Sequence, residues 1–390
     1  MSILTVKEES LTALGDAIRS KVGKSEPLVF PTGMVEAVNG IEAPVPIPEE
    51  AFTFTGNCDS LLANDKWKWF IEQYGNKIKF EEITGAYSLL KNCSYETWNK
   101  DINFKTGSYS GASGISDIFN HMTQLKELDI KINGTLRNDS MISLFQDCHR
   151  LKRIGNIFEN YDMSYMDGYA YGQQQQWFYN CYSLREIDEH FWDNVIISRN
   201  SSYGHLYNSL YYQCNCLDKA TLPVAHKNCN DNCFSSMSFQ NTYRLKDLLF
   251  ITNEDGTPKV ANWKGQLIDL SGKNVGYCSA NSTNRGYITN YNSGITADKW
   301  VKDDATYQAL KNDPDWFTDN YLYSRYNHDS AVNTINSLPD TSAYLATAGG
   351  TNTIKFTGKT GSLTDGGAIN TLTDAEIAVA AAKGWTVSFA

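Results

Sequence analysis

Four cysteines and one histidine within a short stretch form the strongest candidate for metal chemistry in this chain. Cys214, Cys216, His226, Cys229 and Cys233 lie between positions 214 and 233. Thiolate sulfur and imidazole nitrogen are the ligands that zinc binds in tetrahedral sites. The C-x-C and C-x-x-x-C spacings differ from the paired C-x-x-C of common zinc sites. We expect no metal at these residues, and a zinc site and a disulfide stay open as alternatives.

Acidic residues in two places offer the paired carboxylates that glycoside hydrolysis requires. They are Asp303 with Asp304, and the group Glu186, Asp188 and Glu189. Such a pair must flank the scissile bond from two sides, one carboxyl acting as acid and the other as base or nucleophile. The spacing in the sequence does not place either pair across a groove, and acidic pairs on a surface are commonly solvated.

Other catalytic signatures are absent from the sequence. It contains no G-x-S-x-G, no H-E-x-x-H and no phosphate-binding Gly-Lys loop. The six histidines are scattered, and we expect hydrogen-bonding or solvated roles for His121, His149 and His226. We therefore expect neither enzymatic activity nor a cofactor.

Two tracts rich in Tyr, Ser, Asn and Gly have the composition of binding loops. They span residues 160–215 and 277–294. Rigid aromatic side chains supply contact area, and Ser, Gly and Asn supply adaptable hydrogen bonds. Aromatic rings also stack on sugar faces, although tyrosines equally pad an irregular edge of a fold or a subunit interface. The candidate ligand-binding residues are Tyr165, Tyr169, Tyr171, Trp177, Tyr203, Tyr207, Tyr287 and Tyr291.

The elements that position these side chains are indicated by a phrase that recurs along the chain. In the copy from Leu144 to Ile154 it reads L-F-Q-D-C-H-R-L-K-R-I. A fixed phrase with insertions of variable length between its copies predicts a solenoid, one unit per copy. The aromatic residues of five copies are Phe119, Phe145, Phe178, Tyr211 and Phe239, at steps of 26, 33, 33 and 28 residues.

One position of the phrase is filled by small or sulfur-bearing residues. It holds Cys148, Cys181 and Cys214 in three copies, and Met122 and Thr242 in two others. A position that accepts Cys, Met or Thr requires a buried group of small to medium size. We therefore expect these cysteines to pack in the core rather than to form disulfides.

A second recurring pattern is a short alternating segment that ends near a glycine. Period-two alternation with β-branched and aromatic residues predicts strands, and the glycine predicts the turn that follows. Stacked one per unit, such strands would form a parallel sheet along one face. The segments are residues 52–56, 78–85, 102–107, 130–134, 267–272 and 354–358.

The C-terminal segment predicts helices alternating with strands. Residues 329–338 and 373–383 have helical patterns, and Thr373 with Glu376 forms a capping box. A final strand is expected at 386–389, so that Ile354 and Val387 lie 33 residues apart.

The chain divides into three predicted parts. Residues 1–41 form a helical attachment or oligomerisation segment that opens with a capping box from Thr5 to Glu8. Residues 42–50 form a Pro-rich linker, and residues 51–390 form the solenoid. The expected fold class is an α/β solenoid with a parallel β-sheet, preceded by a small helical unit.

Charge and hydropathy restrict the partners. The net charge is −10 over 390 residues, and basic runs are absent, which argues against nucleic acid and anionic membranes. No apolar run approaches the length of a membrane span, and Met1–Leu14 lacks a signal-peptide pattern. We expect a chain made in a cytoplasm without export.

The pattern F-x-x-C-x-x-L-x-x-I, at Phe145–Ile154 and Phe178–Ile187, resembles the BspA-like leucine-rich repeats of bacterial surface proteins. This resemblance covers at least residues 118–250. The opening L-T-A-L-G-D-A-I-R-S-K-V-G-K-S-E-P-L and the C-terminal repeat resemble segments of tail-associated proteins of gut bacteriophages.

Together the resemblances imply a virion tail protein, either a tail fibre or a receptor-binding protein. They imply a homotrimer located in the virion tail, joined to other tail or baseplate proteins through residues 1–41. They also imply a bacterial surface glycan or protein as ligand. A bacterial surface adhesin and a polysaccharide-degrading tailspike are the alternatives.

Overall fold

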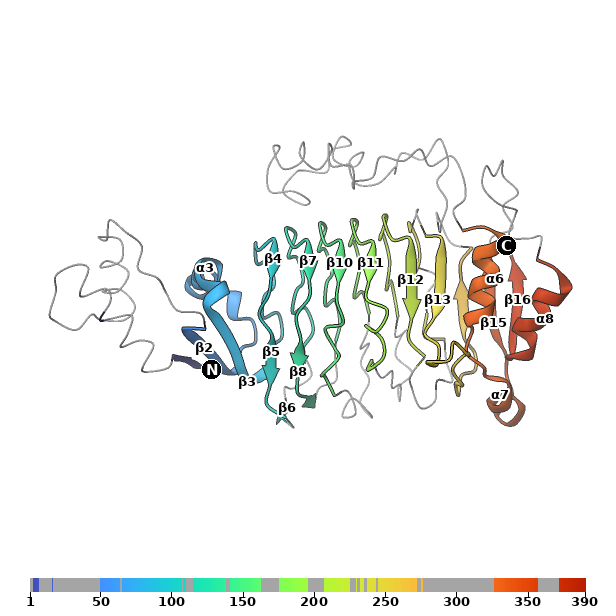
Figure 1. Cartoon of the computed structure of the whole chain (residues 1–390), viewed down its shortest axis with the longest axis horizontal. Helices are drawn as coiled ribbons and strands as arrows, with labels where there is room; N and C mark the ends of the chain where they lie inside the picture. The colour runs from blue at the N-terminus through green and yellow to red at the C-terminus, as the bar shows by residue number, and fades with distance from the viewer. Residues whose placement is uncertain are drawn as a thin grey trace, which may run out of the picture.

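The computed structural model combines several short, mainly parallel sheets with few helices. Figure 1 shows an elongated molecule with strands side by side, β2 and β3 near one end and β15 and β16 near the other. In the parts described, none of the helices has the length and apolarity that a membrane span needs. The described residues are 3–6, 16, 50–63, 65–106, 108–109, 115–137, 141–162, 175–195, 207–224, 229, 232–234, 237–242, 245–271, 275, 326–356 and 372–390.

The first sheet confirms the predicted strands near the N-terminal end. Its order is β1–β2–β3–β5–β8, all parallel except the antiparallel pair β1–β2. Phe52, Phe54 and Phe80 alternate with half-buried residues and point into the core, as period-two alternation predicts. The strands are β1 (Ile3–Val6), β2 (Phe52–Asn57), β3 (Ile78–Gly85), β5 (Ile102–Phe104) and β8 (Ile132–Asn133).

The structure corrects the predicted helix start at Thr5. This residue lies in β1 and pairs with Thr53 of β2, so it does not cap a helix. The edge of β2 offers free backbone donors and acceptors, which β1 satisfies. Apart from residues 3–6 and Asp16, the predicted segment 1–41 and the linker 42–49 lie outside the described residues.

A second parallel sheet is built from the last residues of the phrase copies. Its order is β11–β10–β7–β4, and each strand pairs over two residues only. An exposed residue alternates with an apolar one, as in Arg153 and the buried Ile154. So short an alternation carries too little signal to be predicted from the sequence. The strands are β4 (Thr97–Trp98), β7 (Glu127–Leu128), β10 (Arg153–Ile154) and β11 (Glu186–Ile187).

The described strands fall into five sheets, and the predicted strand segments lie in two of them, the first sheet and the C-terminal sheet. The remaining sheets are β6 (Ser108–Tyr109) with β9 (Leu136–Arg137), β12 (Lys219–Leu222) with β13 (Asp247–Phe250), and the C-terminal sheet.

Near the N-terminal end, one helix packs on the first sheet. It is α3 (Asp65–Tyr74), flanked by the 3-10 turns η1 (Leu61–Ala63) and η2 (Gly75–Lys77). Ile71 of α3 is fully buried, and the ring centroids of Phe70 and Phe52 lie 4.9 Å apart. These contacts cover the apolar face of β2.

The C-terminal part has the predicted alternation of helices and strands. Thr373 and Glu376 form the expected capping box, and Ile354 pairs with Val387 in the predicted register. The additional helix α7 was not predicted. The parallel sheet comprises β14 (Leu267–Asp269), β15 (Asn352–Phe356) and β16 (Trp385–Phe389), and the helices are α6 (His328–Ser337), α7 (Ser342–Ala348) and α8 (Asp374–Ala382).

A row of stacked rings, which we call the ring row, runs through the core at the aromatic position of the phrase. The centroids of Phe119 and Phe145 are 5.5 Å apart and those of Phe145 and Phe178 are 5.4 Å apart, with interplanar angles of 2° and 6°. Tyr211 continues the row 5.4 Å beyond Phe178. All four rings are fully buried. The phrase copies therefore pack on one another through equivalent side chains.

The predicted packing role of the phrase cysteines is confirmed. Cys148, Cys181 and Cys214 are free, fully buried thiols. Each Sγ donates a hydrogen bond to the backbone carbonyl of the aromatic residue in the preceding copy. The bond from Cys181 to Phe145 O, for example, is 3.0 Å long. Burial raises the pKa of Cys181 well above its usual value, so this thiol keeps the proton that it donates.

Replacing Phe145 with Ala should lower the free energy of unfolding by about 3–5 kcal/mol, because a large cavity opens between two neighbouring rings. Phe389→Ala is the matched control, since Phe389 is 40% exposed, and should cost about 1 kcal/mol or less. Urea unfolding followed by tryptophan fluorescence measures both. Equal losses for the two variants would contradict a core that depends on the ring row.

Candidate functional site

The turns that open the phrase copies place polar residues in left-handed backbone conformations. In five of these turns two such residues lie four positions apart, with φ between 54° and 65°. Asn, Asp and His adopt this conformation more readily than most residues, and they fill five of the six second positions. The first positions are Ser88, Asp117, Ser143, Gln176 and Ser209, and the second are Asn92, His121, Asp147, Asn180, Gln213 and Asn241.

Backbone hydrogen bonds join each turn to the next. The N–H of His121 donates to Gln146 O at 2.8 Å, and the N–H of Asp147 donates to Tyr179 O at 2.8 Å. The N–H of Asn180 continues the series to Tyr212 O at 2.9 Å. The turns thus form one continuous edge of the molecule. We call residues 88–92, 117–121, 143–147, 176–180, 209–213 and 238–241 the turn edge.

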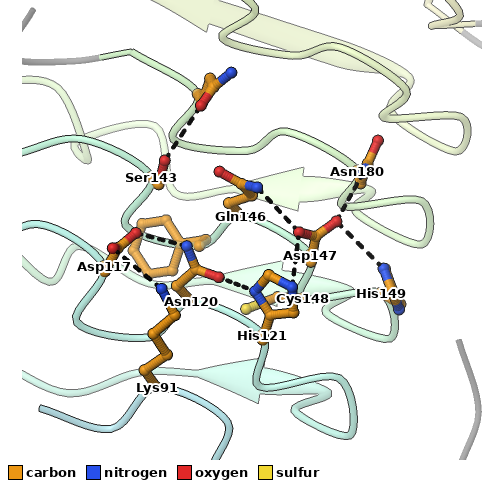
Figure 2. A network of polar contacts seen from close by, with 12 residues as sticks. Lys91, Asp117, Asn120, His121, Ser143, Gln146, Asp147, Cys148, His149 and Asn180 are labelled. Carbon is orange, nitrogen blue, oxygen red and sulfur yellow. Dashed lines mark hydrogen bonds and ion pairs between the residues drawn. The ribbon is translucent and has the colours of Figure 1, made fainter. Parts of the chain in front are cut away.

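A polar network centred on Asp147 connects three adjacent turns (Figure 2). The carboxylate accepts hydrogen bonds from Asn180 Nδ2 at 2.7 Å and from Gln146 Nε2 at 3.1 Å. The Nε2 atoms of His121 and His149 lie 3.3 and 3.5 Å from its oxygens. Asp147 therefore has partners from its own turn and from both neighbours.

The network continues toward the N-terminal end through Asp117. This carboxylate accepts hydrogen bonds from Lys91 Nζ at 3.2 Å and from Asn120 Nδ2 at 2.6 Å. The Oδ1 atom of Asn120 in turn contacts His121 Nδ1. Figure 2 shows these side chains following one another along the turn edge.

The charges within the network follow from burial and hydrogen bonding. Burial raises the pKa of Asp147, but hydrogen bonds from His149 and Asn180 outweigh this effect, so the pKa lies below its usual value. Burial lowers the pKa of His149, although the Asp147 carboxylate opposes the shift. At neutral pH the carboxylate is therefore ionised, and a neutral His149 donates from Nε2.

The network is arranged to hold turns together. His121 uses both ring nitrogens inside it, and His149 is only 5% exposed. A general base must reach the proton that it abstracts from a bound substrate. Burial closes off His149, and both ring nitrogens of the 44% exposed His121 side chain already contact partners in the network, so the geometry favours a positioning role for the network.

One column of the turn edge contains two stacked tyrosines. Tyr179 and Tyr212 follow the buried aromatic residues of adjacent copies, and their ring centroids are 4.9 Å apart at an interplanar angle of 16°. Both are half-buried. Gln146 and Gln240 occupy the same position in the flanking copies, so a planar amide stands on either side of the tyrosine pair.

A small cavity lies at the N-terminal end of the turn edge. Its volume is about 170 Å³, and its lining includes Ser60, Tyr87, Ser88, Lys91 and Asn92. The ammonium group of Lys91 is engaged by Asp117.

The predicted ligand-binding residues fall into two groups. Trp177 and Tyr207 are described, and both are fully buried. Trp177 stacks on Trp192 and donates from Nε1 to Met141 O, while Tyr207 stacks on Phe234. The structure therefore places these two in the core rather than on a binding surface. Tyr165, Tyr169, Tyr171, Tyr203, Tyr287 and Tyr291 lie outside the described residues.

Tyr179 and Tyr212 were not among the predicted residues, because most of the Tyr-rich composition lies in the insertions between phrase copies. Their signal is positional, since both follow the buried aromatic residue in adjacent copies of the phrase. At this position Gln146, Tyr179, Tyr212 and Gln240 are all half-buried.

The cysteine cluster does not gather into one group. Cys229 and Cys233 are joined by a disulfide, whereas Cys214 and Cys216 are buried free thiols. His226 lies outside the described residues, and among those described no three metal-ligating side chains come together.

The acidic pairs are not brought across a groove among the described residues. Glu186 lies 3.6 Å from Arg153 on the outer face of the second sheet. Asp188 accepts a hydrogen bond from the backbone N–H of His190, and Glu189 is exposed. Asp303 and Asp304 lie outside the described residues.

Comparison of the chain with protein-family models, with curated proteins and with solved structures finds no match in any of the three.

Replacing Asp147 with Ala should destabilise the protein by about 1–3 kcal/mol from donors left without an acceptor. The left-handed backbone adds about 1–2 kcal/mol for Ala. Asp147→Asn should cost less, because Asn keeps an acceptor oxygen and already occupies this position at Asn180. Chemical denaturation measures both variants, and an equal loss for the two would contradict this account.

The protein should lose stability as pH falls below about 6.5, the ordinary imidazole value. The pKa of His149 is lowered in the folded state, so the unfolded chain binds the proton first and is favoured. His149→Gln should flatten the pH dependence of the free energy of unfolding between pH 7.5 and 5. Hydrogen bonding to Asp193 raises the pKa of His190 in the folded state. His190→Gln should therefore make the loss of stability with falling pH larger. An unchanged profile in His149→Gln would contradict the assignment.

Proposed function

We propose that the phrase copies are successive coils of a leucine-rich-repeat-like solenoid that spans residues 51–390. Parallel pairing at the spacing of the phrase supports this proposal, as between Glu127 and Arg153 and between Arg153 and Glu186. The ring row gives further support, because equivalent core residues stack from copy to copy. A solenoid needs this nearest-neighbour packing, since each coil contacts only the coils beside it.

We further propose that the chain is a phage virion tail protein, a tail fibre or receptor-binding protein. The resemblance of both chain ends to tail-associated proteins supports this role. In this proposal residues 1–41 attach the chain to the tail or baseplate, three copies assemble, and the solenoid binds a ligand on the bacterial surface. Several weak sites acting together would then give firm attachment.

The observation that carries the recognition role is the pair of accessible tyrosines on the turn edge. Tyr179 and Tyr212 are held on turns whose backbones bond to both neighbours. A binding surface built in this way loses little conformational entropy when a ligand arrives. Aromatic residues in such positions commonly contribute most to binding.

The runner-up is a bacterial surface adhesin with the same repeats, and a polysaccharide-degrading tailspike is the third alternative. The adhesin would use the same turn edge and would differ in its location on a bacterial cell. A tailspike would require a carboxylate pair, which we do not assign.

Purified full-length protein should bind intact gut-type bacteria in a saturable and strain-selective manner. Its mass by light scattering should correspond to three chains. Flow cytometry of labelled protein measures the binding, and release of reducing sugar from capsule tests the tailspike alternative. A monomer that binds none of the strains would overturn the receptor-binding role and would indicate an internal tail component.

A further inference from the structure

We propose that the turn edge around Tyr179 and Tyr212 is a binding site for an uncharged glycan. This inference rests on the proposed recognition function and names its site and ligand class. It concerns residues 143–147, 176–180, 209–213 and 238–241, which form four adjacent turns of the turn edge.

The tyrosine pair provides an aromatic surface of suitable extent. The two rings lie 4.9 Å apart and nearly parallel, and each remains partly accessible. An aromatic ring carries a negative face, which attracts the weakly positive C–H groups of a sugar ring. Each phenol also supplies a hydroxyl group that donates and accepts hydrogen bonds.

The side chains around the rings match the hydroxyl groups of a sugar. Gln146, Gln176, Asn180, Gln213 and Gln240 are all half-buried on the same turns. A primary amide donates two hydrogen bonds and accepts two, as sugar hydroxyls both require and offer. A protein ligand would instead favour a larger apolar centre, and the core of this part of the molecule is closed beneath the rings.

The charge of the surface selects against acidic polymers. None of the four turns contains Lys or Arg. The carboxylate of Asp147 lies among them, ionised and fully engaged by Asn180, Gln146 and the two imidazoles. A uronic acid or phosphate group would meet this charge without a compensating cation. A neutral glycan carries no such penalty.

The periodic backbone suits an extended chain. Neighbouring turns are joined by N–H···O=C bonds of 2.8–2.9 Å at Phe145, Asp147 and Asn180. Equivalent side chains therefore repeat at the spacing of paired strands, which is about 4.8 Å. A glycan lying along the turn edge would meet a ring or an amide at each step.

The test uses the double variant Tyr179→Gln, Tyr212→Gln in the full chain. Gln is chosen because Gln146 and Gln240 hold the same position in neighbouring copies, so folding should be preserved. The control is Trp69→Ala, which removes an aromatic side chain that is 46% exposed on α3, outside the four turns of the proposed site. Thermal unfolding verifies that both variants are folded.

Binding is measured on immobilised neutral glucans, mannans and galactans, beside acidic uronic-acid polymers. The wild type and Trp69→Ala should bind at least one neutral polymer equally well and should prefer it to the acidic ones. The double variant should bind that polymer roughly tenfold more weakly or worse, as expected for the loss of central aromatic contacts. A folded double variant with wild-type affinity would overturn the inference, as would a preference for acidic polymers or binding to no glycan.

A second experiment separates this inference from the proposed function. If the wild type binds bacteria and the double variant binds them equally well, the receptor-binding role stands and the glycan site is wrong. Loss of cell binding after protease treatment, with retention after periodate oxidation, would also overturn the glycan site and indicate a protein ligand. If the wild type ignores all bacteria but binds neutral glycans through the tyrosines, the tail role fails and the glycan site stands.

Discussion

Backbone hydrogen bonding between neighbouring phrase copies is the constraint on which the rest of the structure depends. A single turn cannot satisfy its own N–H groups, because alternate ones point along the molecule toward the next copy. The bond from Phe119 to Leu144 and the bond from Phe145 to Trp177 show the same pattern two copies in succession. Once the turns are in register, every side-chain position of the phrase is repeated at a fixed place beside its equivalents.

Register converts a set of residue types into continuous rows. The aromatic position becomes the ring row, the sulfur position becomes a series of thiols bonded to carbonyls, and the second left-handed position becomes the network around Asp147. Insertions between copies do not disturb these rows, since the steps of 26 and 33 residues both return to the same register. Local chemistry and overall packing are therefore determined by the same alignment.

The sequence predicts those features that repeat over enough residues to be recognised. Alternation predicted β2, β3 and β15, and the capping box at Thr373 predicted α8, because each signal is local and long enough. Two-residue strands such as β10 leave no periodicity to detect. The sequence does not predict the left-handed turns, because Ser, Gln and Asn at those positions are also common in ordinary loops.

Prediction of the candidate site failed for a different reason. Composition identifies a tract rich in tyrosine but does not say which ring faces inward. Trp177 and Tyr207 are covered by neighbouring aromatic rings, whereas Tyr179 and Tyr212 emerge on the turn edge. Only the pairing of one copy with the next distinguishes them.

The left-handed positions have a consequence for how such a surface can diversify. They restrict their own side chains to types that tolerate that backbone, whereas the residue preceding each second position carries no such restriction and is Lys91, Asn120, Gln146, Tyr179, Tyr212 or Gln240. Lys91, Asn120 and Gln146 are tied to Asp117 or Asp147, whereas a lineage could exchange Tyr179 and Tyr212 while the scaffold beneath them stays the same. The fold thus separates the residues that can be substituted from the left-handed positions that cannot. New binding specificities could then arise from combinations of such substitutions on the same architecture.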